Sequence, residues 1–141
     1  MSFDSLSDVN WLAIIVGTLV YFGIGGFWYS PAGFGKPWMR SVGMEMPESG
    51  ERPGAAIYAA PLLSDLVVAI ATAWLAHATG SSTVGDGVLL GLVVSIGYMV
   101  SLTATTATFS QFPAKGTWFW ITASYNLVGV TILAIIVSAW D

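Results

Sequence analysis

The stretch from Gly87 to Phe109, GVLLGLVVSIGYMVSLTATTATF, decides the fold, because it has no charged side chain and is long enough to cross a membrane. A helix needs roughly 20 apolar residues to span the hydrocarbon core. None of the apolar stretches alternates apolar and polar residues, as the strands of a lipid-facing barrel do. The sequence therefore predicts an all-α, integral membrane four-helix bundle, formed as a single transmembrane domain over residues 1–141. Its spans are expected at about 9–30, 54–79, 87–109 and 117–140.

The composition of the 141-residue chain agrees with a membrane location. Hydrophobic residues make up 55% of it and charged residues 9%, whereas an ordinary soluble domain carries about 25% charged residues. The absence of cysteine excludes disulfides and thiol nucleophiles, and His77 alone is too little for a Cys/His metal site. The basic residues do not form a run, so the sequence lacks the basic patch that is typical of a nucleic-acid-binding protein. We therefore expect no metal, no cofactor and no nucleic-acid partner.

The basic residues also predict the orientation, because Lys and Arg near helix ends are held on the cytoplasmic side. All four lie in two connections, with Lys36, Arg40 and Arg52 between the first two spans and Lys115 between the last two. We therefore expect both termini on the non-cytoplasmic side and a cytoplasmic interfacial loop at 31–53. The same four side chains can meet anionic lipid headgroups at about 1 kcal/mol each, although the topology alone accounts for them.

Asp65 is the first candidate for function. It lies near the middle of the second span, where an acid costs at least roughly 2.5 kcal/mol, and no basic side chain of the loops reaches that depth. Pro61 lies four residues earlier on the same helix face and removes a backbone donor, so a helix kink with a free carbonyl is expected there. Residues at a similar depth on the other spans can complete a buried polar layer: Tyr21, Tyr98, Ser101 and Asn126.

Three states of Asp65 are compatible with such a layer: a protonated carboxyl, a carboxylate held by hydrogen bonds, or a carboxylate neutralised by a bound cation. Its role is equally open. Hydrogen bonds to Asn126 would make Asp65 a structural link between helices, whereas proton exchange or cation binding would make it a transport site. Recognition of a lipid or another ligand is the third alternative.

Small residues recur at every fourth position of the third span, at Gly87, Gly91 and Ser95. Such a stripe lets helix backbones approach closely. Packing within the chain is one interpretation, and a self-association face is the other. The same span ends in a run of hydroxyl residues, 101–108, which either bond back to helix carbonyls or line a polar pore.

Short motifs distributed over nearly the whole chain resemble one known family. They are Asn10-Trp11-Leu12-Ala13, Gly25-Gly26-Phe27-Trp28-Tyr29-Ser30-Pro31, Phe34-Gly35-Lys36-Pro37-Trp38-Met39, Ser124-Tyr125-Asn126-Leu127-Val128-Gly129 and Ala139-Trp140. These motifs are similar to the signatures of DUF1761, a family of small multi-pass membrane proteins of unknown function. The resemblance implies a four-helix protein of a bacterial or archaeal plasma membrane. It implies no catalytic residue.

The residues leave two hypotheses for function. The first is a small structural or accessory membrane protein that acts by helix packing, either as a homo-oligomer or as a subunit of a larger membrane complex. The alternative is an oligomeric proton- or cation-coupled carrier or pore centred on Asp65, with its path between subunits because four helices enclose little space. An enzyme would need acid–base chemistry from Asp65 without a nearby His, Lys or Glu, so we expect no enzymatic activity. Membrane lipids are the remaining expected partners.

Overall fold

The computed structural model describes residues 7–45 and 54–140, and within these ranges it contains helices and connections but no strand. In chain order the elements are α1 (Trp11–Trp28), α2 (Gly35–Ser41), α3 (Ala56–Thr79), α4 (Val84–Val94), the π-helix η2 (Ser95–Val100), α5 (Ser101–Phe109) and α6 (Lys115–Ala139). Because α4, η2 and α5 follow one another without a break, they form one long helix, Val84–Phe109. The prediction of an all-α chain with four long apolar helices is confirmed.

Local chemistry explains where two of these helices begin and end. The third span begins at Val84, three residues before the expected range, because Thr83 and Asp86 form a capping box. In it Thr83 Oγ1 accepts from the Asp86 amide at 3.1 Å, and Asp86 Oδ2 accepts from the Thr83 amide at 3.1 Å. At the end of α3, Gly80 has a φ of 69°, a left-handed conformation that commonly closes helices.

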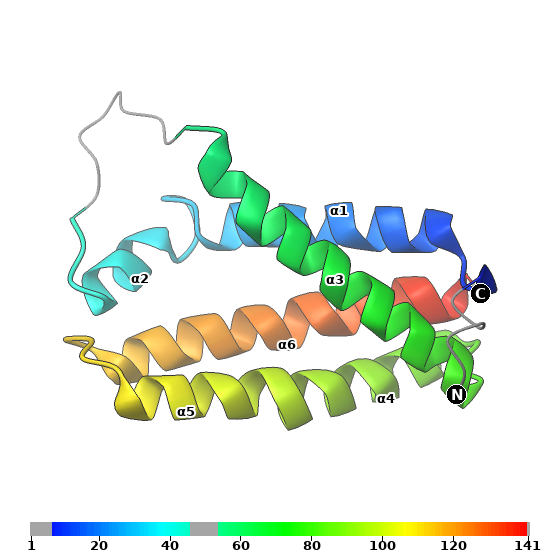
Figure 1. The fold of residues 1–141 in the computed structure, drawn as a ribbon. Coiled ribbons are helices and arrows are strands. Elements are labelled where there is room, and N and C mark those ends of the chain that lie inside the picture. Colours follow the sequence, from blue (N-terminus) through cyan, green and yellow to red (C-terminus); the bar gives the residue numbers. More distant parts are fainter. Residues whose placement is uncertain (1–6, 46–53, 141) are drawn as a thin grey trace.

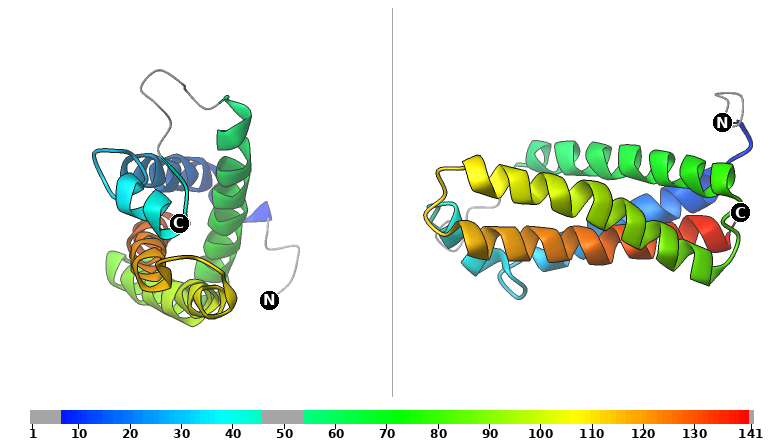
Figure 2. Two further views of the ribbon diagram at one scale, coloured as in Figure 1. Left: turned by 90° about the vertical axis from the view of Figure 1, so that its left-hand side faces the viewer. Right: turned by 90° about the horizontal axis from the view of Figure 1, so that it is seen from below.

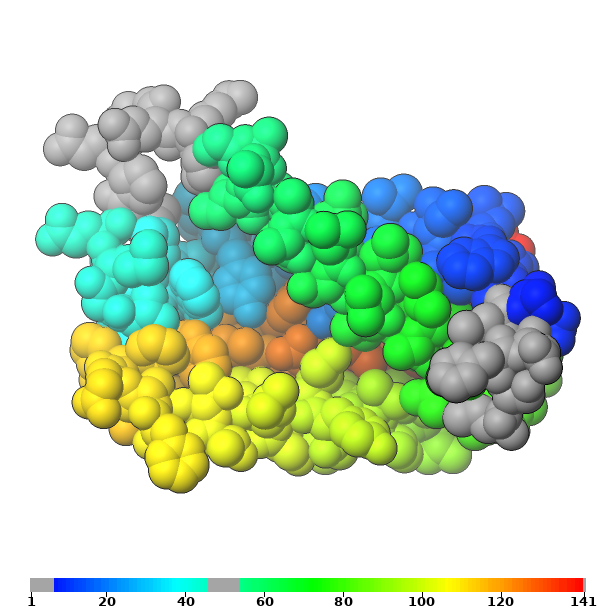
Figure 3. Space-filling view, in the orientation of Figure 1, coloured from blue at the N-terminus to red at the C-terminus, as the bar shows by residue number. Residues whose placement is uncertain are grey.

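The helices pack around α6, which contacts α1, α2, α3 and all three parts of the third span. Its apolar stretch is 44% buried, against 22–28% for the other three long helices. In Figure 1, α6 and the third span run side by side, while α3 crosses α1 obliquely; the end-on view in Figure 2 separates the same helices. A narrow strip of α6 (orange) remains visible between α3 and the third span in Figure 3. The arrangement is therefore a bundle with one central helix.

The two ends of the bundle differ in charge. At one end Asn10 caps α1 by accepting from the amides of Leu12 and Ala13, each at 3.1 Å, and its Nδ2 donates to the Trp140 carbonyl at 2.6 Å. The start of α1, the end of α6 and the α3–α4 turn therefore share this end (Figure 1). The opposite end carries α2 and the α5–α6 connection, together with the basic residues Lys36, Arg40 and Lys115. Arg52 lies outside the described residues.

The stripe of small residues in α4 packs inside the chain, against α6. A Cβ atom at Gly87 would lie 2.6 Å from the Ile135 Cα, and one at Gly91 would lie 2.5 Å from the Thr131 Cα. Ser95 is fully buried, and its hydroxyl donates to the Gly91 carbonyl at 2.6 Å. Of the two interpretations of this stripe, the contacts with α6 agree with packing within the chain.

Candidate functional site

A polar contact between α1 and α6 lies at the centre of the candidate site. The Tyr21 hydroxyl donates to Asn126 Oδ1 at 2.9 Å, and only 3% of Tyr21 is exposed. Asn126 Nδ2 in turn donates to the Thr122 carbonyl one turn earlier, at 3.0 Å. The ring of Tyr21 stacks on the ring of Tyr125, with centroids 5.2 Å apart and an interplanar angle of 17°. Neighbouring residues of α6 therefore hold both the hydroxyl and the ring of Tyr21.

Gly129 makes this contact sterically possible. It lies one turn after Tyr125 on α6, and a Cβ atom there would overlap the Tyr21 ring. A larger residue would push α1 away and lengthen the bond to Asn126. The spacing Asn126-x-x-Gly129 thus combines a hydrogen-bond partner with a surface flat enough for the tyrosine ring.

Asp65 faces this contact from α3. It is 7% exposed and lies close enough to Tyr21 and Tyr125 to interact with both electrostatically. Within residues 7–45 and 54–140 its carboxyl group makes no hydrogen bond. We therefore find Asp65 beside the tyrosines. The hydrogen bond to Asn126 that the structural-link alternative requires is absent among the described residues, where Tyr21 donates to the Asn126 side-chain oxygen.

Two members of the expected polar layer lie elsewhere, which corrects that prediction. Tyr98 is 70% exposed, and the exposed Ser101 donates its hydroxyl back to the Ile96 carbonyl at 3.0 Å. Both point away from α6 because the third span turns its small residues toward that helix. The buried positions are Gly87, Gly91, Ser95, Thr103 and Ala107.

The π-helix η2 keeps these small residues on one face. In a regular α-helix of 3.6 residues per turn, positions four apart drift around the axis. An extra residue in the turn at Ser95–Val100 offsets the drift, so the four-residue spacing continues to face α6.

The hydroxyl groups of Thr103, Thr106 and Thr108 bond back to the carbonyls four residues earlier, at 2.7–3.0 Å.

An aromatic cluster extends the site toward α2; its residues belong to the family motifs quoted above but were not predicted to be part of the site. Tyr29 contacts Tyr125 edge-on with centroids 5.2 Å apart, and Trp38 packs against Tyr29 at 5.4 Å. Trp28 donates its Nε1 hydrogen to the Ile121 carbonyl at 3.1 Å. The contact of Trp38 with Tyr29 depends on the chain reversal between α1 and α2, which spacing alone does not reveal.

Comparison with known proteins identifies the family to which the chain belongs. The model of the family described as "Protein of unknown function (DUF1761)" matches residues 12–138. The chain belongs to the DUF1761 family. No curated protein and no solved structure matches it. The site of this DUF1761 protein must therefore be interpreted from its own contacts.

The connection after α1 in this DUF1761 protein is folded onto α6. It contains α2, which packs against α6, and the Ser41 carbonyl accepts from the Ala114 amide at 3.2 Å. The interfacial loop expected at 31–53 is therefore partly helical in its described part. Pro61 is exposed on α3, and the helix is continuous on both sides of it. The kink remains a prediction.

Proposed function

We propose that this DUF1761 protein is a small structural or accessory multi-pass membrane protein, which acts by packing its helices against another copy of itself or a larger membrane complex. The observation that carries the proposal is the position of Tyr98. This residue lies close to the middle of the third span, 70% exposed, and its hydroxyl makes no hydrogen bond within the described residues. Leaving a hydroxyl unpaired in hydrocarbon costs about 4–8 kcal/mol on water-to-cyclohexane scales.

A partner helix would relieve this cost and has room to approach. Gly97, Ser101 and Thr105 are exposed beside Tyr98, at a four-residue spacing, and we call these four residues the outer polar face. A Cβ atom at Gly97 would meet no atom within 4 Å in the part of the chain that the structure describes. Small residues at this spacing favour close contact between membrane helices, and Tyr98 can then donate across the contact.

The test is the assembly state of Gly97→Leu, compared with wild type by native mass spectrometry in mild detergent and by cross-linking in the membrane. We expect the variant to fold but to lose its homo-oligomer or its larger complex. Ala71→Leu is the matched control, since Ala71 is an exposed small residue of α3 outside the outer polar face. Equal assembly of wild type and Gly97→Leu would contradict the proposal.

A second candidate, an oligomeric proton- or cation-coupled carrier or pore, is favoured by Asp65. A buried carboxyl group without a hydrogen bond or a basic partner suits reversible protonation better than a structural link. Tyr125 is near Asp65 and contacts Tyr29 at the α2 end of α1, whereas Val130 and Leu133, later on α6, belong to a fully buried apolar core. This asymmetry supports proton access from the α2 end.

The two candidates are separated by Asp65→Asn, which removes the charge and nearly keeps the shape. Proton and cation flux would be measured in vesicles loaded with a pH-sensitive dye, and assembly in parallel. A carrier predicts loss of a flux present in wild type, with assembly retained. Absence of flux in wild type, together with unchanged assembly in Asp65→Asn, would leave the accessory function alone.

A further inference from the structure

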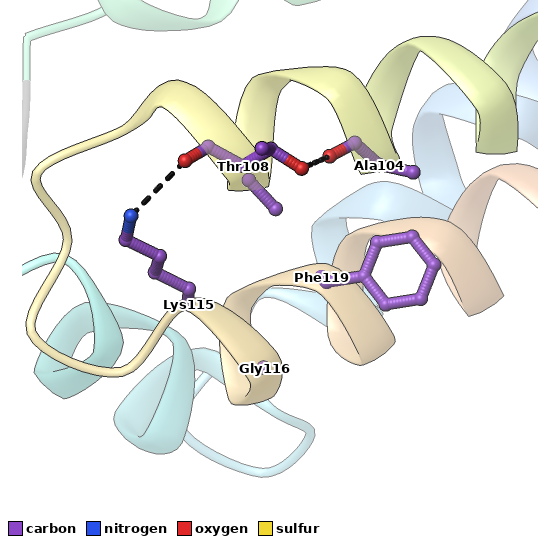
Figure 4. A pocket seen from close by; sticks show the side chains of 6 residues that line it. Ala104, Thr108, Lys115, Gly116 and Phe119 are labelled. Atoms are coloured by element: carbon purple, nitrogen blue, oxygen red, sulfur yellow. Dashed lines mark hydrogen bonds between the residues drawn. The ribbon is translucent and has the colours of Figure 1, made fainter.

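A groove opens between α5 and the start of α6, at the end of the molecule that carries α2. It has a volume of about 340 Å³ and is lined by Ala104, Ala107, Thr108, Lys115, Gly116 and Phe119. Figure 4 shows Phe119 and Lys115 along α6, facing Ala104 and Thr108 on α5. A Cβ atom at Gly116 would meet no atom of the described residues within 4 Å, so the groove is open beside this residue.

A single charge lies at one end of this apolar groove. Lys115 Nζ donates to the Thr108 carbonyl at 3.1 Å, and this bond holds the ammonium group against the last turn of α5 (Figure 4). An ammonium group has three donors, so two remain for a ligand. Among the residues that the structure describes, no acidic side chain lines the groove. Lys115 also lies where two spanning helices meet their connection, which is the depth of the lipid headgroups.

We propose that this groove is a binding site for one anionic phospholipid, with an acyl chain along Ala104, Ala107 and Phe119 and the phosphate group on Lys115. The apolar lining suits a hydrocarbon chain, and the ammonium group is complementary to the headgroup charge. The site differs from a general attraction between basic loops and the membrane because a groove and a fixed lysine select the same molecule. It is independent of whether the protein assembles with a partner.

The experiment is native mass spectrometry of the full-length protein with phosphatidylglycerol or phosphatidylcholine of identical acyl chains. We expect wild type to retain phosphatidylglycerol about fivefold more strongly, the ratio that one lysine contributes near an anionic surface. Lys115→Met should abolish the preference for phosphatidylglycerol, and Lys115→Arg, which keeps the positive charge, should retain it. Lys36→Met, which changes a basic residue outside the groove, should keep it.

Two further measurements separate the groove from the charge. Gly116→Leu keeps Lys115 and fills open space, so retention of both lipids should fall to one low level. Inorganic phosphate should not raise the melting temperature of wild type, whereas phosphatidylglycerol should. A preference that survives in Lys115→Met, equal retention of both lipids by wild type, or equal stabilisation by free phosphate would overturn the proposal.

Discussion

Tyr21 donates a 2.9 Å hydrogen bond to Asn126 and thereby joins α1 to the central helix α6 in the buried part of both. The amide group of Asn126 is held in turn by the Thr122 carbonyl of its own helix. Because the hydrocarbon core contains no water, polar groups there must find partners within the protein. The pair therefore fixes how α1 is rotated against α6, and it places the Tyr21 ring in front of Asp65.

Tyr21→Phe removes this bond and keeps the ring stacked on Tyr125. We expect the free energy of unfolding to fall by about 0.6 kcal/mol, the average for a hydrogen bond between membrane helices. Reversible unfolding of the purified protein in mixed micelles measures the change. Tyr58→Phe is the control, because Tyr58 is 51% exposed on α3 and should lose nothing. Equal effects of the two variants would contradict a specific Tyr21–Asn126 link.

Gly129→Ala tests the close approach that accompanies the bond. The added methyl group overlaps the Tyr21 ring, so we expect a loss of about 1–3 kcal/mol, as is usual for overpacking. The double variant Tyr21→Leu/Gly129→Ala should recover part of that loss because the smaller side chain leaves room for the methyl group. A double-mutant cycle in unfolding experiments gives the coupling. Strict additivity would show that Gly129 acts independently of Tyr21.

The long helices could be predicted from the sequence because each is a local property. Apolar length alone places Ala56–Thr79 within two residues of the expected 54–79. The capping box at Thr83 and Asp86, which moves the start of the third span, was also recognisable as a pattern of residue types. What length and capping do not give is the rotation of one helix against another.

The rotation of each helix about its own axis determines which residues belong to the candidate site. Depth in the membrane correctly brought Tyr21 and Asn126 together, but it also predicted Tyr98 and Ser101, which face outward. The four-residue spacing of Gly87, Gly91 and Ser95 contained the signal, since these residues take the face toward α6 and leave Tyr98 on the other. Thr103 and Ala107 continue the face toward α6 only because of the π-helix η2, and we identified no sequence pattern that predicts this π-helix.

Asp65→Leu tests whether the carboxyl group is a structural link. Since Asp65 makes no hydrogen bond within the described residues, its loss leaves no partner unsatisfied. We expect the free energy of unfolding to rise by about 0.5–2 kcal/mol, as when a group kept for function is replaced by one that packs. Asn126→Leu is the opposite control, since it strands the Tyr21 hydroxyl and should destabilise. A clear destabilisation by Asp65→Leu would make it a link between helices after all.

The orientation of the bundle can be tested directly because the chain contains no cysteine. Single variants Ser82→Cys and Gln111→Cys place a thiol at exposed positions at opposite ends, in the α3–α4 turn and in the α5–α6 connection. Lys36, Arg40 and Lys115 gather at the second of these ends, and basic ends are held in the cytoplasm. We therefore expect a membrane-impermeant maleimide to label Ser82→Cys in intact cells and Gln111→Cys only after permeabilisation. Labelling in the reverse order would show the opposite orientation, with the groove beside Lys115 in the non-cytoplasmic leaflet.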